Sequence, residues 1–326
     1  MASSDLRMVL QLKRYKNNPI IIPDQTSWWE KKAVFNCAVL FDGKVIHMLY
    51  RAIGEYENYV SRIGYASSSD GFIFTKNKEP VLFPELDYER FGIEDPRLIS
   101  VDNKIYVTYV VLSDYVKNNP SVSTALATTE NFSYYERLGI VTLPGSQDKD
   151  VVLFPRTIAD SKIQRYMLLH RPSAWVGPKH NTEKPSIWIS EGDSVTNYYN
   201  HSLLIKPEEN WEALKIGAGV PPIKTEKGWL VIYHGVNEKH VYSAGALLLD
   251  LEIPTKILGR TRTPILTPEE QYELNGDVSN VVFPTGACIL DNELFVYYGA
   301  ADKVCCLATV ELKEILNYLL SDACSV

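Results

Sequence analysis

The sequence repeats one strand–turn–strand pattern five times. In each copy an apolar segment leads into a short polar turn, and a strand rich in β-branched and aromatic residues follows. The turns begin at Asp42, Asp102, Asp160, Thr225 and Asp291, which are 60, 58, 65 and 66 residues apart. Each interval is long enough for a four-stranded sheet and its loops. Because regular β-units of this size are typical of propellers, the sequence predicts an all-β, five-bladed β-propeller.

Helical periodicity is convincing mainly at the C-terminus. There the segment 310–320 places four apolar side chains on one face, namely Leu312, Ile315, Leu316 and Leu319. No stretch is typical of a linker, so residues 1–326 are expected to form a single catalytic propeller domain with a short C-terminal helix. A β-sandwich with coincidental hairpin spacing is the alternative fold.

Composition excludes several classes of protein. The 326 residues include 33 basic and 40 acidic side chains, and a net charge of −7 argues against broad nucleic-acid binding. No apolar run approaches the roughly 18 residues that cross a bilayer, and the N-terminus is a poor signal peptide. Five cysteines, two of them adjacent at Cys305 and Cys306, argue against a disulfide framework. The expected location is therefore a reducing one, the cytoplasm.

Polar side chains interrupt the apolar strands at corresponding places in different units. Before the turns these residues are Asn36, Asp95 and Arg156, and after the following strands they are Arg51, Arg171, His234 and, slightly later, Asp302. Lys215 lies ahead of the fourth unit. Charges within strands are unfavourable unless they are paired or solvated. Since the inner strands of a propeller surround its central channel, these side chains are expected to share one wet cavity there.

The residue types in this set favour one kind of chemistry. Arg156, Arg171 and Lys215 suit an anion, because guanidinium groups match phosphate or carboxylate oxygens and Lys adds a point charge. One carboxylic acid can serve as a general acid. An inverting glycosidase needs a second carboxyl group to activate water, whereas an attacking phosphate needs no base. An anion site beside one acid therefore favours phosphorolysis over hydrolysis.

Several short motifs resemble glycoside hydrolase family 130, whose members are five-bladed propellers that phosphorolyse β-mannosides. The resemblance covers most of the chain and rests on the order and spacing of LYRA (49–52), GIEDPRL (92–98), LFPR (153–156), LHRP (169–172), KIGAGVPPI (215–223), YHG (233–235), YSAGALLLDL (242–251) and YYGAAD (297–302).

The resemblance implies a role for each polar residue. Asp95 is implied to be the single general acid, protonating the glycosidic oxygen through a mannosyl hydroxyl. The implied phosphate-binding residues are Arg156, Arg171, Lys215, His234 and Tyr242. The implied mannose-binding residues are Asn36, Arg51 and Asp302. Because the family reaction inverts the anomeric centre, a β-mannoside would give α-mannose 1-phosphate.

The expected substrates are a β-mannoside oligosaccharide and inorganic phosphate, with no cofactor, no metal, no nucleic acid and no membrane as partner. The resemblance favours β-1,4-mannooligosaccharides or mannosyl-N-acetylglucosamine, although the residues do not decide between 1,4, 1,2 and 1,3 linkages. Whether the chain forms a homo-oligomer is also left open. The alternatives are a β-mannosidase on the same scaffold, a non-catalytic sugar-binding propeller and a protein-interaction propeller.

Some residues have two readings. Glu94 is expected to be structural and to pair with Arg97, because strand alternation should turn it away from Asp95. Arg62 either borders the sugar site or caps a strand. Aromatic loop residues form acceptor-sugar subsites or simply pack; these are Trp28, Trp29, Tyr115, Trp175 and His180.

Overall fold

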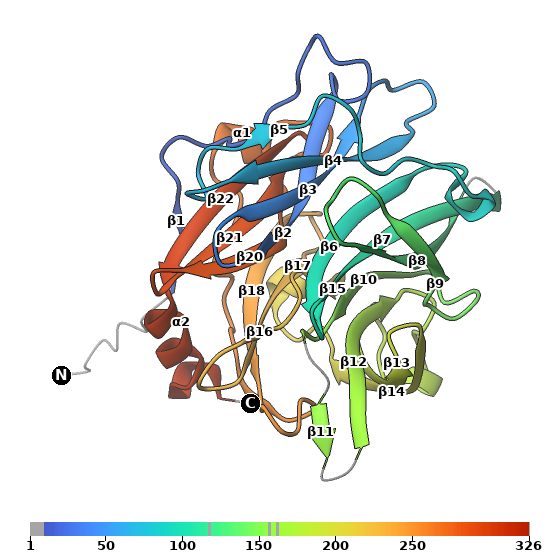
Figure 1. The fold of residues 1–326 in the computed structure, drawn as a ribbon. Coiled ribbons are helices and arrows are strands. Elements are labelled where there is room, and N and C mark those ends of the chain that lie inside the picture. Colours follow the sequence, from blue (N-terminus) through green and yellow to red (C-terminus); the bar gives the residue numbers. More distant parts are fainter. Residues whose placement is uncertain (1–9, 117–118, 156–157, 161–162, 326) are drawn as a thin grey trace.

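The polar turns join neighbouring antiparallel strands in the computed structural model, and the sheets they build form a ring of five blades (Figure 1). The structure describes residues 10–116, 119–155, 158–160 and 163–325. The predicted five-bladed propeller is confirmed, and the alternative β-sandwich is wrong. Within the described residues no helix is long and apolar enough to span a membrane.

Each blade has four main strands, and the innermost strand begins the blade in four of the five. Blades 1 and 2 contain β2 (Ala33–Phe41), β3 (Ile46–Ile53), β4 (Ser61–Ser68), β5 (Thr75–Lys76), β6 (Ile93–Val101), β7 (Lys104–Val116), β8 (Asn119–Thr129) and β9 (Glu136–Ile140). Blade 3 contains β10 (Asp148–Leu153), β11 (Ile158–Asp160), β12 (Ile163–Pro172), β13 (Ile187–Ser194) and β14 (Asn197–Ile205). Blade 4 contains β15 (Lys215–Ala218), β16 (Ile223–Lys224), β17 (Trp229–Val236), β18 (Tyr242–Leu249) and β19 (Ile257–Arg260).

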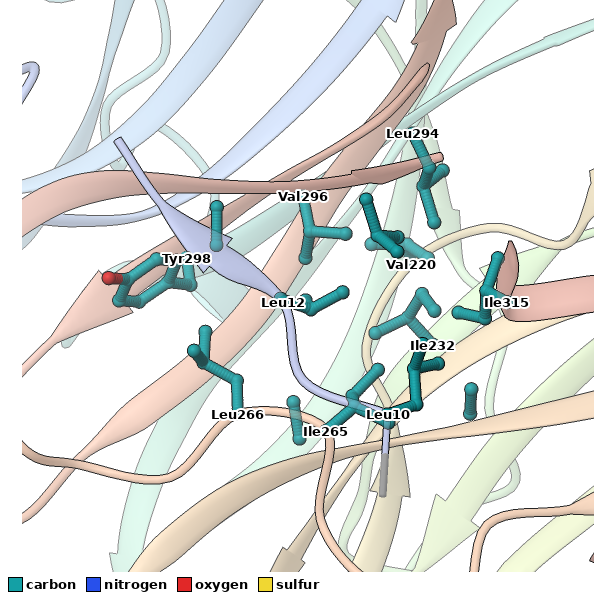
Figure 2. Close-up of a cluster of buried hydrophobic side chains, with 14 of the residues drawn as sticks. Leu10, Leu12, Val220, Ile232, Ile265, Leu266, Leu294, Val296, Tyr298 and Ile315 are labelled. Carbon is teal, nitrogen blue, oxygen red and sulfur yellow. The ribbon is translucent and has the colours of Figure 1, made fainter. Parts of the chain in front are cut away.

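Blade 5 combines the two ends of the described chain. It contains β20 (Val282–Leu290), β21 (Glu293–Ala300), β22 (Val304–Glu311) and, as its outer strand, β1 (Lys13–Arg14). This pairing closes the ring and covers the outer edge of β22. Figure 2 shows Leu10 and Leu12 inserted among apolar side chains of blade 4, such as Ile232, and of blade 5, such as Val296. The seam is therefore held by both hydrogen bonds and apolar packing.

The helical segments that the structure describes are short; three lie between blades, one lies between β12 and β13 of blade 3, and two follow β22. They are η1 (Asp87–Glu89), η2 (Pro178–His180), η3 (Asn210–Glu212), α1 (Gln271–Leu274), α2 (Leu312–Leu319) and η4 (Asp322–Cys324). The predicted C-terminal helix is α2, which buries Ile315, Leu316 and Leu319 against the same cluster as Leu10.

The inner strands β2, β6 and β10 each contain a bulge near the end at which they begin. We call this end of the ring the pocket face. A residue with positive φ occupies each bulge: Asn36 at 50°, Asp95 at 48° and Asp150 at 56°. Asn and Asp tolerate this left-handed conformation better than other residues with a side chain. Because a bulge breaks the alternation of a strand, it redirects the side chain at that position.

Four blades share a buried set of three polar side chains, which we call the blade triad. A tyrosine of the second strand donates to a glutamate from the turn before the inner strand, at 2.6–2.8 Å, and a cation of the outer strand lies 2.6–3.5 Å from the same carboxylate. The triads are Tyr50–Glu30–Lys76, Tyr109–Glu89–Arg137, Tyr233–Glu212–Arg260 and Tyr298–Glu273–Arg14. Each therefore joins three parts of one blade.

Blade 3 has a different set of polar side chains at this place. His170 Nδ1 lies 2.7 Å from Asp148 Oδ2, and His170 Nε2 lies 2.9 Å from Ser190 Oγ. Ser190 Oγ also contacts His201 Nδ1 on the outer strand. This hydrogen-bonded chain crosses the blade from its inner to its outer strand, as the triads do elsewhere.

The triad of blade 5 gives a stability prediction. Glu273 is fully buried, and Arg14 supplies its nearest positive charge at 2.9 Å. Arg14→Ala is expected to lower the free energy of unfolding by about 3 kcal/mol, because it leaves a buried carboxylate without its counter-charge. Urea-induced unfolding followed by tryptophan fluorescence measures this loss. The control is Lys13→Ala, which removes an exposed side chain from the same strand; equal losses in both variants would contradict the prediction.

Candidate active site

A pocket of about 160 Å³ lies where the five inner strands begin, and every blade contributes to its walls. Eight of the nine site residues named from the sequence line this pocket, namely Asn36, Arg51, Asp95, Arg171, Lys215, His234, Tyr242 and Asp302. Arg156, the ninth, lies outside the described residues. The structure thus brings together side chains from positions 36 to 302 of the chain, while their individual roles stay predictions.

Sequence reasoning missed Lys149 and Asp150, which also line the pocket. It aligned blade 3 on its turn and so matched Arg156 with Asp95. The structure shows that the equivalent of Asp95 is Asp150, because both occupy bulges and β10 and β11 pair separately with β12. A signal was present: an apolar run follows Asp150 directly, as it follows Asn36.

Asp95 lies in a hydrogen-bonded group with blade 1. Its Oδ1 accepts from Asn36 Nδ2 at 2.8 Å and lies 3.3 Å from Arg51 Nη1. Arg51 also donates through Nη2 to Glu94 and through Nε to Ser61. The expectation that Glu94 pairs with Arg97 is therefore wrong. The bulge at Asp95 cancels the alternation on which that expectation rested, so both carboxylates face the same guanidinium.

The carboxyl groups of this half of the pocket differ in acidity. Burial disfavours the charged form of Asp95, but Arg51, Arg97 and Lys149 together outweigh burial and hold its pKa below the usual value. Burial raises the pKa of Asp302 to about 6, because negative Asp95 acts in the same direction and Arg51 opposes it only in part. Asp95 is thus ionised in the free protein, and Asp302 titrates near neutral pH.

The half of the pocket that blades 3 and 4 supply, which we call the cationic half, carries Lys149, Arg171 and Lys215. Arg171 Nε donates to Asp150 Oδ2 at 2.6 Å, and its Nη1 donates to Ser173 Oγ at 2.9 Å. Lys215 Nζ lies 5.1 Å from the centre of the Tyr242 ring. Burial, with Arg171 nearby, lowers the pKa of Lys215 to about 8, so this amine is still largely protonated at neutral pH.

His234 completes the cationic half as a neutral group. Its Nε2 lies 3.6 Å from Asp150 Oδ2, and its ring packs against Phe283 with 4.5 Å between ring centres. Burial lowers the pKa of His234 to about 3, and the nearby cations act in the same direction. The imidazole is therefore neutral here and adds no charge at neutral pH.

Two glycines make room for the polar groups. A Cβ atom at Gly217 would lie 2.1 Å from Asp150 Oδ2 and 2.5 Å from His234 Cε1. A Cβ atom at Gly299 would lie 2.1 Å from Asn36 Oδ1. A side chain at either position would displace a pocket residue, so the close packing of these polar groups requires glycine at both positions.

Arg97 is buried, is not among the lining residues of the pocket and links three blades. Its Nε donates to the carbonyl oxygen of Gly219 in blade 4, and its Nη1 donates to that of Asp95 at 2.9 Å. Its Nη2 lies 3.9 Å from Asp150 Oδ1 in blade 3. This buried cation therefore lies between the two bulge carboxylates and holds the strands that carry them.

The aromatic residues left open by the sequence divide into several environments. Trp29 is fully buried and stacks on Tyr50, so its reading as a sugar subsite is wrong. Trp28 is exposed and lies under the guanidinium of Arg62, 4.9 Å from its ring centre. Trp175 and His180 stack face to face with 5.7 Å between ring centres, in the loop that follows Arg171. The side chain of Tyr115 lies outside the described part of the chain.

A larger groove of about 860 Å³ lies at the opposite face of the ring, beside α2 and the turns at Glu226 and Asp291. None of the site residues predicted from the sequence lines it. Among the described residues no cluster of three or more His, Cys, Asp or Glu side chains could hold a metal ion.

Comparison with known proteins agrees with this geometry. The model of the glycoside hydrolase 130 family, described as β-1,4-mannooligosaccharide phosphorylase, matches residues 10–321. A 1,2-β-oligomannan phosphorylase of Thermoanaerobacter sp. strain X514 is 39% identical over 313 residues, covering 94% of this chain and 99% of the relative. A β-1,2-mannobiose phosphorylase of the same organism is 37% identical over 319 residues, covering 94% and 99% of the two chains.

Solved structures give the same result. The β-1,2-mannobiose phosphorylase from Listeria innocua, in complex with β-1,2-mannobiose, superposes with a TM-score of 0.82 and 31% sequence identity. The match covers 95% of this chain and 99% of that chain. The chain therefore belongs to glycoside hydrolase family 130.

The raised pKa of Asp302 predicts a pH-dependent gain in stability on substitution. Between its ordinary value of 3.8 and about 6, Asp302 ionises more readily in the unfolded chain, so its ionisation destabilises the fold as the pH rises through this range. Asp302→Asn removes this penalty. The variant is expected to gain up to about 3 kcal/mol relative to the wild type at pH 8, and little at pH 4. Unfolding curves at both pH values measure the difference; a pH-independent effect would contradict the prediction.

Proposed function

We propose that this member of glycoside hydrolase family 130 phosphorolyses β-1,2-linked mannosides with inversion, giving α-mannose 1-phosphate and a shortened acceptor. One observation carries the proposal. A single pocket holds the carboxyl group of Asp95 from blade 2 and a set of cations from blades 3 and 4 that includes Lys149, Arg171 and Lys215. A proton donor facing an anion site is what attack by phosphate on a glycoside requires.

The cationic half would hold the nucleophile. Arg171 is fixed by Asp150 and Ser173, so its remaining guanidinium nitrogen is presented in one orientation. Lys149 makes no hydrogen bond or ion pair with another described residue, which leaves its amine for a bound anion. Positive groups fixed before the anion arrives hold it in line for attack and offset its repulsion from the nearby carboxylates.

The acid half would hold the sugar and supply the proton. Asn36 and Arg51 fix the carboxylate of Asp95, and Asp302 lies beyond Arg51 in the same pocket. Asp95 is ionised in the free protein, so it must gain a proton before it can donate one. Phosphate bound in the cationic half adds negative charge to a buried site and thereby raises the pKa of Asp95. Asp95 would thus be protonated, and able to act as the acid, when phosphate is bound.

Hydrolysis fits the pocket less well. A water nucleophile needs a carboxylate base, and Asp150 is the carboxylate nearest the cationic wall. Burial opposes its ionisation, but Arg171 and the other positive neighbours outweigh burial and hold the pKa of Asp150 far below its usual value. A carboxylate this acidic is a weak base. The cations would also be left without a ligand if water were the nucleophile.

The linkage is taken from the relatives. The sequence alone favoured β-1,4-mannooligosaccharides or mannosyl-N-acetylglucosamine. A relative described as a β-1,4-mannooligosaccharide phosphorylase, from Ruminococcus albus, is 30% identical, whereas the two Thermoanaerobacter enzymes named for β-1,2 linkages are 37–39% identical. We therefore assign the β-1,2 linkage. The reaction would need inorganic phosphate as co-substrate and no further cofactor.

An assay of β-1,2-mannobiose with and without phosphate tests the reaction. The purified chain is expected to release mannose 1-phosphate only when phosphate is present, since the nucleophile is then the bound anion. The same assay with β-1,4-mannobiose is expected to be at least tenfold slower. Release of free mannose at the same rate without phosphate would establish the β-mannosidase alternative, and faster turnover of the β-1,4 disaccharide would overturn the linkage.

The role of Asp95 is tested by Asp95→Asn. The amide keeps an oxygen that can accept from Asn36, so the fold should persist, but it cannot supply the proton. We expect kcat to fall by about 10²–10⁴-fold, the usual worth of a general acid, with little change in the melting temperature. Steady-state kinetics and a thermal melt measure both quantities. A variant with more than a third of wild-type kcat would show that another group is the acid.

A further inference from the structure

Asp150 is a buried carboxylate in the wall that would hold phosphate, and the proposed mechanism gives it no chemical step. It is 3% exposed and lines the pocket beside Arg171 and His234. A negative group at an anion site weakens the binding of any anion that cannot donate a hydrogen bond to it. Its presence at the bulge of β10 therefore calls for a chemical reason.

Inorganic phosphate differs from other tetrahedral anions in one property. Near neutral pH each phosphate ion carries at least one proton, so it can donate a hydrogen bond. Sulfate has almost the same size and shape but carries no proton. A fixed hydrogen-bond acceptor in the site would accept from the hydroxyl group of phosphate, but it would repel sulfate. A buried group left without its partner is penalised heavily, which makes such a site selective.

We propose that Asp150 accepts a hydrogen bond from the hydroxyl group of bound phosphate and thereby selects phosphate over fully ionised anions such as sulfate. This inference rests on the proposed function, because it assigns a specificity-determining residue to the phosphate site of the same pocket. Asp150 makes no covalent bond and transfers no proton in this role.

The surroundings of Asp150 support an acceptor role. Among the described lining residues of the cationic half, Lys149, Arg171 and Lys215 can only donate hydrogen bonds. His234 Nδ1 is buried and has no hydrogen-bond partner among the described residues. Asp150 is thus the only carboxylate of this half that the structure describes. The low pKa of its carboxyl group, set by burial against Arg171 and the other positive neighbours, keeps it an acceptor rather than a donor.

The position of Asp150 is fixed before any ligand binds. Arg171 Nε donates to Oδ2 at 2.6 Å, and Arg97 Nη2 lies 3.9 Å from Oδ1. The absence of a side chain at Gly217 leaves the space that this carboxylate occupies. A phosphate hydroxyl bound to Asp150 would leave the unprotonated oxygens for the cations and for attack on the sugar. The same contact would therefore select the ion and orient it.

The test compares four anions by isothermal titration calorimetry at pH 7.5: phosphate, arsenate, sulfate and monofluorophosphate. Arsenate carries a proton as phosphate does, whereas monofluorophosphate has fluorine in place of the hydroxyl. The wild type is expected to bind phosphate and arsenate at least tenfold more tightly than the other two. In Asp150→Asn the amide can donate to an ionised oxygen, so the ratio of phosphate to sulfate affinity is expected to fall at least tenfold.

Asp148→Asn is the matched control. Asp148 is a buried carboxylate two residues earlier on the same strand, but it contacts His170 and does not line the pocket. This variant should keep the wild-type preference for phosphate.

If the wild type binds sulfate or monofluorophosphate as tightly as phosphate, the inference is overturned. An unchanged ratio of phosphate to sulfate affinity in a folded Asp150→Asn variant would also overturn it. Failure of the wild type to bind phosphate at all would instead overturn the proposed function.

Discussion

The buried carboxylate of each blade triad is the constraint on which the pocket depends. A charged glutamate without solvent is tolerated only where a tyrosine hydroxyl and a cation meet it, so each triad fixes one tyrosine of the second strand. In blades 1 and 4 the next residue along that strand lines the pocket: Arg51 follows Tyr50, and His234 follows Tyr233. Locking one residue of a strand fixes the direction of its neighbour. The triads therefore orient the pocket while lying outside it.

The inner strands orient pocket side chains in a second way, through their bulges. Regular alternation would place every other side chain at the axis, but a bulge adds a residue and turns its side chain into the channel. Three such residues, Asn36, Asp95 and Asp150, have positive φ, a strained conformation that persists only where the surroundings enforce it. Arg97 connects two of these strands, because it contacts both Asp95 and Asp150. The strain is thus stored where polar groups must converge.

These two devices explain what the sequence could and could not predict. Turn spacing and strand composition specify the blades, since both follow from local chemistry. Site residues such as Arg171 and His234 were predictable because polar groups interrupt apolar strands at matching positions. Asp150 was missed because the match assumed one continuous inner strand per blade, and blade 3 has two segments. The partner of Glu94 was missed because alternation cannot reveal a bulge. The triads were missed because each joins residues distant in the chain.

Blade 3 departs from the others at both levels, and the two departures belong together. Its hydrogen-bonded set uses His170 and Asp148 in place of the tyrosine, glutamate and cation of the other blades. Its pocket residues, Arg171 and Asp150, pair with each other inside the blade, whereas Asp95 pairs with Arg51 of its neighbour. This pair and the hydroxyl group of Ser173 keep the guanidinium of Arg171 ordered within one blade. The symmetry of the fold thus supplies equivalent positions, and the asymmetry of blade 3 places a carboxylate–guanidinium pair of one blade in the pocket wall.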